Sequence, residues 1–118
     1  MSDPMDSYKI AVYIPEKFSQ KLMESVNSVI EPFYPGYDMC FSITKVIGTW
    51  RPLEGSKPFL GKQGKIERAE EVKIEFIIKA EDVQKVLTTI LEVHPYEEPS
   101  IDVIPCHGWR DFVSDPRR

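Results

Sequence analysis

The chain has few cysteine and histidine residues and no long hydrophobic run. Its 118 residues include two cysteines and two histidines. Cys40 and Cys106 lie far apart without a Cys-x-x-Cys spacing, so free thiols are expected rather than a disulfide framework. No stretch approaches the roughly 18 apolar residues that cross a membrane. The N-terminal sequence MSDPMD has no basic region followed by an apolar core, so no secretory signal is recognised and a cytoplasmic location is expected.

Acidic residues outnumber basic ones. The chain carries 15 basic and 19 acidic residues, a net charge of −4, and the basic residues are scattered along the sequence. This distribution argues against binding to the phosphate backbone of a nucleic acid. Hydrophobic residues make up 42% of the chain and charged residues 29%, a composition typical of a folded globular protein. The length accommodates one compact domain.

The hydrophobic spacing predicts two helices among four strands. Runs of β-branched and alternating apolar residues predict strands over 8–14, 40–47, 72–78 and 100–104, with Gly48 closing or bending the second of them. A helix of about 16 residues is predicted after Pro15 from one apolar stripe, formed by Phe18, Leu22, Val26, Val29 and Phe33. A second amphipathic helix is predicted over 83–94, where Pro95 ends it.

The order of these elements, β-α-β-β-α-β, predicts an α+β fold. Two split β-α-β halves give a ferredoxin-like sandwich, in which both helices cover one face of a four-stranded antiparallel sheet. We expect a single domain over 8–107 with a long loop or hairpin at 49–68, a flexible N-terminus at 1–7 and a C-terminal tail at 108–118. The other sheet face is expected to be mixed in polarity and to favour self-association; it would carry Ala11, Tyr13, Ile77 and Ile104.

The long segment 49–68 is the first candidate site. Connections longer than about 12–15 residues are uncommon in compact domains and are often functional. Arg51 and Lys57 would hold an anionic ligand, Glu54 adds a further polar group, and Trp50 and Phe59 would form apolar walls. The segment lacks the spacing of a phosphate-binding loop. An equally weighted interpretation is a structured loop that packs on a neighbouring subunit.

The segment 94–99, HPYEEP, is the second candidate site. Tyr96 would add an apolar wall, and a divalent metal could be bound by His94 with Glu97 or Glu98. In an extended backbone the two glutamates point to opposite sides, so both cannot easily reach one ion. The alternative is that His94 is a packed side chain that hydrogen-bonds the last carbonyl groups of its helix.

Other chemistry has little support in the sequence. There is no Gly-x-Ser-x-Gly motif, and neither histidine belongs to a recognised serine or cysteine nucleophile motif. Glu70 and Glu71 are expected on a solvated strand face. No catalytic residue is assigned, and an enzymatic activity is not favoured.

The two candidate segments together resemble a known domain. The sequence GTWRPLEGSKPFLG at 48–61, followed about 30 residues later by HPYEEP, resembles the domain inserted in the YqfO branch of the dinuclear-metal-centre hexameric proteins, a family also called NGG-interacting-factor-like. The resemblance spans about 8–105 and implies a ferredoxin-like fold similar to the trimer-forming CutA and PII proteins. In that family the two-metal site, associated with hydrolase or GTP-cyclohydrolase-like activity, is built by the flanking domain, so the resemblance does not extend that activity to this chain.

The residues and the resemblance together indicate a stand-alone accessory or regulatory module. We expect it to self-associate as a dimer or trimer and to bind a small anionic ligand or a divalent metal where the two segments meet; no cofactor is assigned with certainty. One alternative is a protein-protein interaction module that needs no ligand. A less favoured alternative is a metal-dependent hydrolase, against which the low histidine content argues. Neither a membrane nor a nucleic acid is expected as a partner.

Overall fold

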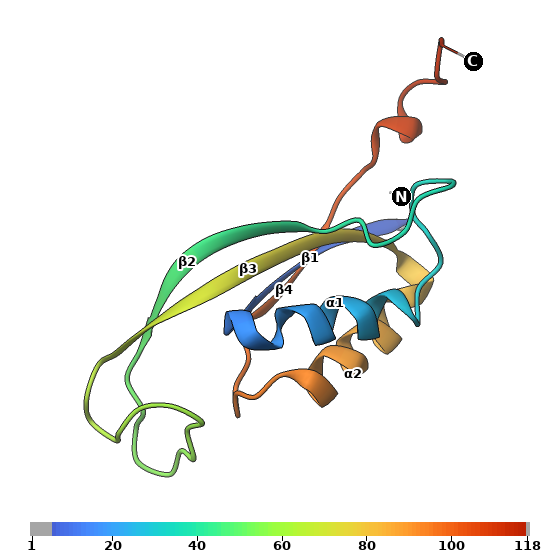
Figure 1. Cartoon of the computed structure of the whole chain (residues 1–118). Helices are drawn as coiled ribbons and strands as arrows, with labels where there is room; N and C mark the ends of the chain where they lie inside the picture. Colours follow the sequence, from blue (N-terminus) through green and yellow to red (C-terminus); the bar gives the residue numbers. More distant parts are fainter. Residues whose placement is uncertain (1–5, 118) are drawn as a thin grey trace, which may run out of the picture.

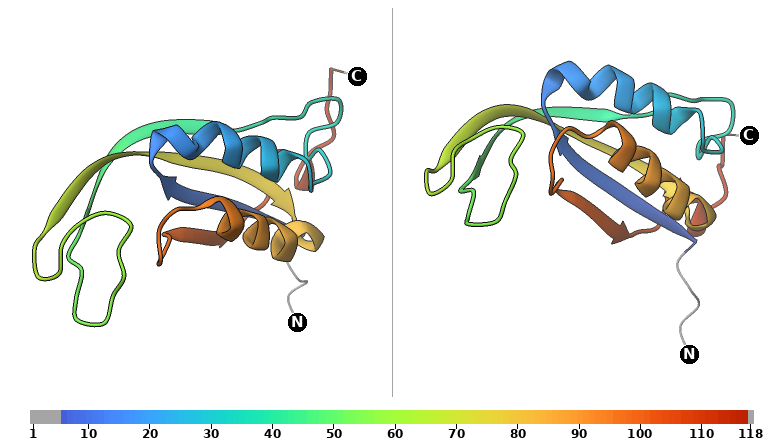
Figure 2. Two further views of the ribbon diagram at one scale, coloured as in Figure 1. Left: turned by 60° about the horizontal axis from the view of Figure 1, so that its bottom comes forward. Right: turned by 90° about the horizontal axis from the view of Figure 1, so that it is seen from below.

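Four strands and two helices follow one another in the predicted order, β-α-β-β-α-β. In the computed structural model, which describes residues 6–117, the strands are β1 (Ser7–Ile14), β2 (Ser42–Trp50), β3 (Glu67–Lys79) and β4 (Ile101–Pro105). The helices are α1 (Ser19–Asn27) and α2 (Val83–Val93), each preceded by a short 3-10 turn. The strands pair in the order β2-β3-β1-β4, and every pair is antiparallel. Both helices lie on the same face of the sheet (Figures 1 and 2), so the ferredoxin-like sandwich is confirmed.

The core lies between the helices and the sheet. Along β1, and along β3 from Val72 onward, every second residue is apolar, and the strand register places Val12 opposite Ile74 and Ile10 opposite Phe76. The alternation therefore sends both sets of side chains to the helix-covered face. The buried core consists of Ile10, Val12, Ile14, Leu22, Met23, Val26, Val72, Ile74, Phe76, Ile78, Val86 and Ile90.

The first helix is shorter than its apolar stripe predicts. The prediction of about 16 residues was wrong in its C-terminal part, because α1 ends at Asn27 and leaves Val29 and Phe33 in the connection to β2. The Asn27 side chain contacts that connection, since its Oδ1 accepts a hydrogen bond from the Met39 backbone N–H at 2.9 Å. Further along, the buried carboxylate of Asp82 accepts a hydrogen bond from the Glu31 backbone N–H at 3.2 Å. These polar contacts hold the chain away from a helical path.

Strands β2 and β3 form an arm that continues beyond the end of β1. The last residue of β1, Ile14, pairs with Val72, so the earlier part of β3 pairs with β2 alone. Of the two expectations for Gly48, that it closes β2 was wrong, because the strand continues through it to Trp50. Figure 1 shows the arm curving away from the sheet before it enters the long connecting loop, which comprises residues 51–66.

The two ends of the domain are formed by β1 and by the segment after β4. Residues 1–5 of the expected flexible N-terminus lie outside the described residues, whereas Ser7 is buried and is the first residue of β1. Its hydroxyl donates a hydrogen bond to the Cys106 carbonyl oxygen at 2.6 Å. The C-terminal tail contains a 3-10 turn at Trp109–Asp111 and projects away from the sheet (Figure 1). Both cysteines are free thiols. None of the helices within residues 6–117 is long and apolar enough to span a membrane.

Candidate functional site

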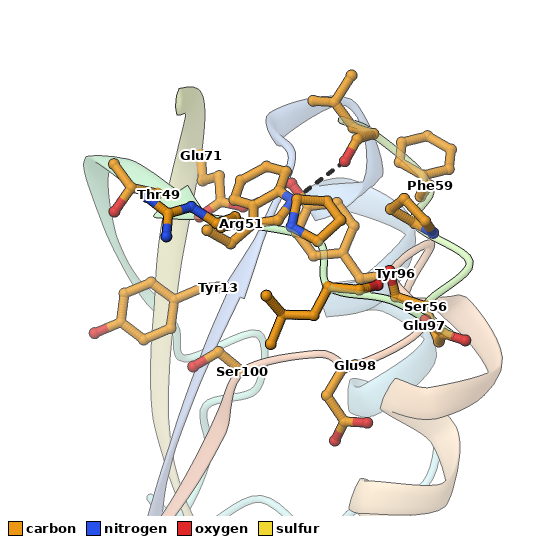
Figure 3. A pocket seen from close by; sticks show the side chains of 16 residues that line it. Tyr13, Thr49, Arg51, Ser56, Phe59, Glu71, Tyr96, Glu97, Glu98 and Ser100 are labelled. Atoms are coloured by element: carbon orange, nitrogen blue, oxygen red, sulfur yellow. Dashed lines mark hydrogen bonds between the residues drawn. The ribbon is translucent and has the colours of Figure 1, made fainter. Parts of the chain in front are cut away.

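A pocket of about 560 Å³ opens where the arm approaches the connection between α2 and β4. Figure 3 shows side chains from the arm, the long loop and this connection around one cavity. The connection is held beside the end of β1 by a hydrogen bond of 3.1 Å from the Tyr13 N–H to the Ser100 carbonyl oxygen. The lining residues are Tyr13, Gly48, Thr49, Trp50, Arg51, Pro52, Leu53, Ser56, Pro58, Phe59, Leu60, Glu71, Tyr96, Glu97, Glu98 and Ser100.

Two contacts fasten the long loop against the rest of the site. The Lys57 backbone N–H donates a hydrogen bond of 2.8 Å to Oε1 of Glu97, which joins the loop to the α2–β4 connection. The indole Nε1–H of Trp50 donates a hydrogen bond to the Leu60 carbonyl oxygen at 3.1 Å. The loop is therefore attached both to the end of β2 and to the HPYEEP segment.

Tyr96 is the centre of an aromatic cluster in the pocket. Its ring centroid lies 5.4 Å from that of Trp50, 6.0 Å from that of Phe59 and 5.0 Å from that of His94. Such tilted pairs lie in the range of favourable aromatic contacts. The cluster brings together the two segments that the sequence singled out, which lie more than 30 residues apart.

The buried carboxylate of Glu71 contacts this aromatic cluster through Tyr96. The Tyr96 hydroxyl donates a hydrogen bond of 2.6 Å to Oε2 of Glu71. Glu71 is only 6% exposed, so its expected place on a solvated strand face was wrong. Burial, with a smaller contribution from Glu71, raises the pKa of the Tyr96 phenol, which therefore stays protonated and donates to the carboxylate.

Gly48 makes room for this carboxylate. A Cβ atom at Gly48 would collide with Oε1 of Glu71, whereas the glycine leaves the space open. Glu71 and Gly48 lie on adjacent strands of the arm, on the face opposite the helices. Neither residue was among the predicted site residues. The available signal was the alternation of β3, which puts Glu71 on the face opposite Val72, the same face as the pocket.

His94 is a packed side chain rather than an open ligand in this arrangement. It is 7% exposed, and its Nε2 lies 2.6 Å from the Tyr13 carbonyl oxygen. Its Nδ1 accepts a hydrogen bond of 3.1 Å from the Tyr96 backbone N–H. A carbonyl oxygen can only accept and a backbone N–H can only donate, so the imidazole is neutral with its proton on Nε2. Both ring nitrogens are engaged.

Burial lowers the pKa of His94, although the Tyr13 carbonyl and Glu71 act in the opposite direction. The folded state therefore disfavours the protonated imidazole, and the stability of the protein should fall as the pH drops below the ordinary histidine pKa of about 6.5.

We expect His94→Gln to reduce the loss of Tm between pH 7.5 and pH 5.5. The measurement is thermal unfolding at a series of pH values. His107→Gln is the control, since that histidine is half exposed and hydrogen-bonded to Asp111. An unchanged pH profile in His94→Gln would contradict the assignment.

Six of the nine predicted site residues line the pocket. They are Trp50, Arg51, Phe59, Tyr96, Glu97 and Glu98. Glu54 is exposed on the loop and does not line it, and Lys57 contributes its backbone N–H to the loop contact. His94 contacts Tyr96, with ring centroids 5.0 Å apart, but does not line the pocket. Within residues 6–117, no group of three or more His, Cys, Asp or Glu side chains is arranged to hold a metal ion. Metal binding stays a prediction.

Comparison with known proteins relates this chain to two groups. Residues 57–114 match the family model described as CutA1 divalent ion tolerance protein. A protein of Halalkalibacterium halodurans, described as GTP cyclohydrolase 1 type 2 homolog, is 37% identical over 98 residues, which make up 83% of this chain and 26% of that protein. The chain thus spans about a quarter of the length of this curated relative.

Two solved structures show the same architecture. The Bacillus cereus protein related to NIF3 has a TM-score of 0.76 and 29% identity, covering 91% of this chain and 27% of that one. CutA from Synechococcus elongatus has a TM-score of 0.64 and 20% identity, covering 89% of this chain and 80% of that one. The predicted resemblance is confirmed: the chain has the ferredoxin-like fold of CutA, and its sequence is similar to a part of the YqfO/NIF3 family proteins.

Proposed function

We propose that the chain is a self-associating accessory or regulatory module that binds a small ligand in the pocket between the arm and the HPYEEP segment. The observation that carries this proposal is the pocket itself. Its volume of about 560 Å³ lies within the range of roughly 300–1,000 Å³ that is usual for small-molecule sites. Its walls combine aromatic rings with a few polar groups, a composition typical of such sites.

The sheet supports the self-association part of the proposal. The face opposite the helices carries Lys9, Ile77 and Ile104 side by side, and Ile104 is 44% exposed. The arm extends past β1 with only two strands in it, so neither face of the arm is covered by a helix (Figure 2). A second copy could cover apolar surface of either region.

The sequence suggested two classes of ligand, a small anion and a divalent metal. Arg51 lines the pocket, as expected for an anion site, but the Lys57 side chain does not. The name of the matching family, divalent ion tolerance, is the support for a metal, with Glu97 and Glu98 as the available oxygen donors. The activity named for the longer relatives is not proposed, because this chain matches only about a quarter of their length.

Native mass spectrometry of untagged protein, before and after chelation, tests this proposal. We expect a discrete oligomer that carries a stoichiometric bound mass. Loss of that mass on chelation would identify the ligand as a metal, and its retention would identify a small molecule. A monomer with nothing bound, which also fails to bind small molecules in a fragment screen, would overturn the proposal.

An interaction module without a ligand is the second candidate function. Leu53 and Ile66 are large apolar side chains of the long loop that are 67% and 65% exposed, so a partner chain could bury them. An oligomer in which Leu53→Ser and Ile66→Ser abolish association, without any bound mass in the parent protein, would favour this candidate.

A further inference from the structure

One oxygen of the buried Glu71 carboxylate has no partner among the described residues and lies against Gly48, which lines the pocket. Glu71 is more than nine-tenths buried, and its Oε2 is held by the Tyr96 hydroxyl. Among residues 6–117, no hydrogen bond or ion pair reaches Oε1. No fully enclosed polar side-chain atom in that range lacks a partner, so Oε1 is an accessible atom, and Glu71 lines the pocket. A desolvated carboxylate oxygen of this kind favours a ligand that donates hydrogen bonds or carries positive charge.

The remainder of the pocket agrees with such a ligand. Glutamates outnumber basic residues by three to one among the lining residues, which include Glu71, Glu97, Glu98 and Arg51. Tyr96 lies next to Glu71, because its hydroxyl reaches the carboxylate, and the Trp50 ring lies beside Tyr96 with a centroid separation of 5.4 Å; all three residues line the pocket. Aromatic faces attract cations, most strongly where water is excluded. The site therefore combines a carboxylate acceptor with aromatic walls.

The Tyr96 hydrogen bond also orients the carboxylate. Because the phenol occupies Oε2, and Gly48 leaves the space beside Oε1 clear of a side chain, the carboxylate has a defined position before any ligand arrives. A preorganised acceptor loses less conformational freedom on binding. Gly48 and Tyr96 are thus positioning residues for Glu71.

We propose that this pocket binds a small organic cation with a flat, hydrogen-bond-donating head, such as an amidinium or guanidinium group, which donates to Oε1 of Glu71 and lies against Trp50 and Tyr96. This proposal rests on the proposed function, because it names the ligand class of the same pocket. It differs from the anionic class that the sequence suggested.

Benzamidine is a suitable probe, and benzoate is its anionic counterpart of the same shape. Binding of each to the full chain is measured by isothermal titration calorimetry or ligand-observed NMR at low salt. We expect benzamidine to bind at least tenfold more tightly than benzoate, and Glu71→Gln to weaken benzamidine binding at least tenfold. The glutamine keeps an oxygen for the Tyr96 hydroxyl, so the variant should fold, as circular dichroism and Tm would verify.

Glu70→Gln is the matched control, because Glu70 is the adjacent residue on β3, is exposed and lies on the opposite face of the strand. It makes the same change in net charge and should leave benzamidine affinity within twofold. Tighter binding of benzoate than of benzamidine, or equal losses in Glu71→Gln and Glu70→Gln, would overturn the inference and leave the proposed function standing. Failure of benzamidine to bind overturns the inference, whereas the proposed function itself is judged by the native mass measurement.

Discussion

Replacement of Ile74 with alanine should lower the free energy of unfolding by about 2–5 kcal/mol. Ile74 is completely buried in the middle of β3, where it lies opposite Val12 of β1 and Ile43 of β2. The loss combines the transfer free energy of the removed methyl and methylene groups with the cavity left between the sheet and the helices. For a domain of this length the expected decrease in Tm is roughly 8–20 °C. Thermal and urea-induced unfolding would measure it.

Ile43→Ala is the matched control for this prediction. Ile43 is the cross-strand neighbour of Ile74 on the same face of the sheet, but it lies on the edge strand and is 52% exposed. Truncation of a half-exposed side chain should cost less than about 1 kcal/mol. Equal decreases in Tm for the two variants would mean that the core is not centred under the helices, contrary to the packing described above.

Replacement of Trp50 with alanine should release the long loop from the pocket. The substitution removes the hydrogen bond to the Leu60 carbonyl oxygen and the ring contact with Tyr96. Each interaction contributes roughly 0.5–1.5 kcal/mol, so their joint loss, about 1–3 kcal/mol, should increase the population of the open loop by a factor of about 5 to 150. Hydrogen-deuterium exchange of peptides covering residues 51–66 should accelerate by that factor, because local opening governs exchange there.

The second tryptophan provides the control for this experiment. Trp109 lies in the C-terminal tail and is 41% exposed. Its ring contacts the Arg110 guanidinium and does not line the pocket. Trp109→Ala should leave exchange of the loop unchanged, and it should retain benzamidine binding, whereas Trp50→Ala should lose it. Identical exchange rates in the loops of the parent protein and Trp50→Ala would show that Trp50 does not fasten the loop.

Both variants probe features that the sequence indicated to different degrees. The burial of Ile74 follows from the alternation in β3, which requires no knowledge of the rest of the chain. Trp50 was identified as a wall of a binding site because it opens a long loop rich in glycine and proline. Its two contacts, with Leu60 and Tyr96, were not predictable, because they depend on how the loop folds back on the HPYEEP segment.

The errors have a common physical origin. The apolar stripe after Pro15 continues to Phe33, but α1 ends at Asn27, where polar side chains bind the following connection instead of extending the helix. Glu71 follows another glutamate in an alternating strand and therefore looked solvated, yet the HPYEEP segment covers it. In each case a contact with a distant part of the chain outweighed the local pattern.

By itself, the amino-acid sequence determined the order of the strands and helices, the residues of the core and the two segments that form the pocket. These properties are local, since the side-chain periods of strands and helices and the positions of glycine and proline are encoded within a few neighbouring residues. Only the tertiary structure decided that Tyr96 binds Glu71, that both nitrogens of His94 are engaged and that Gly48 clears the space for a carboxylate. These partners are brought together by strand pairing and by the path of the α2–β4 connection, and no short stretch of sequence encodes distances between residues so far apart.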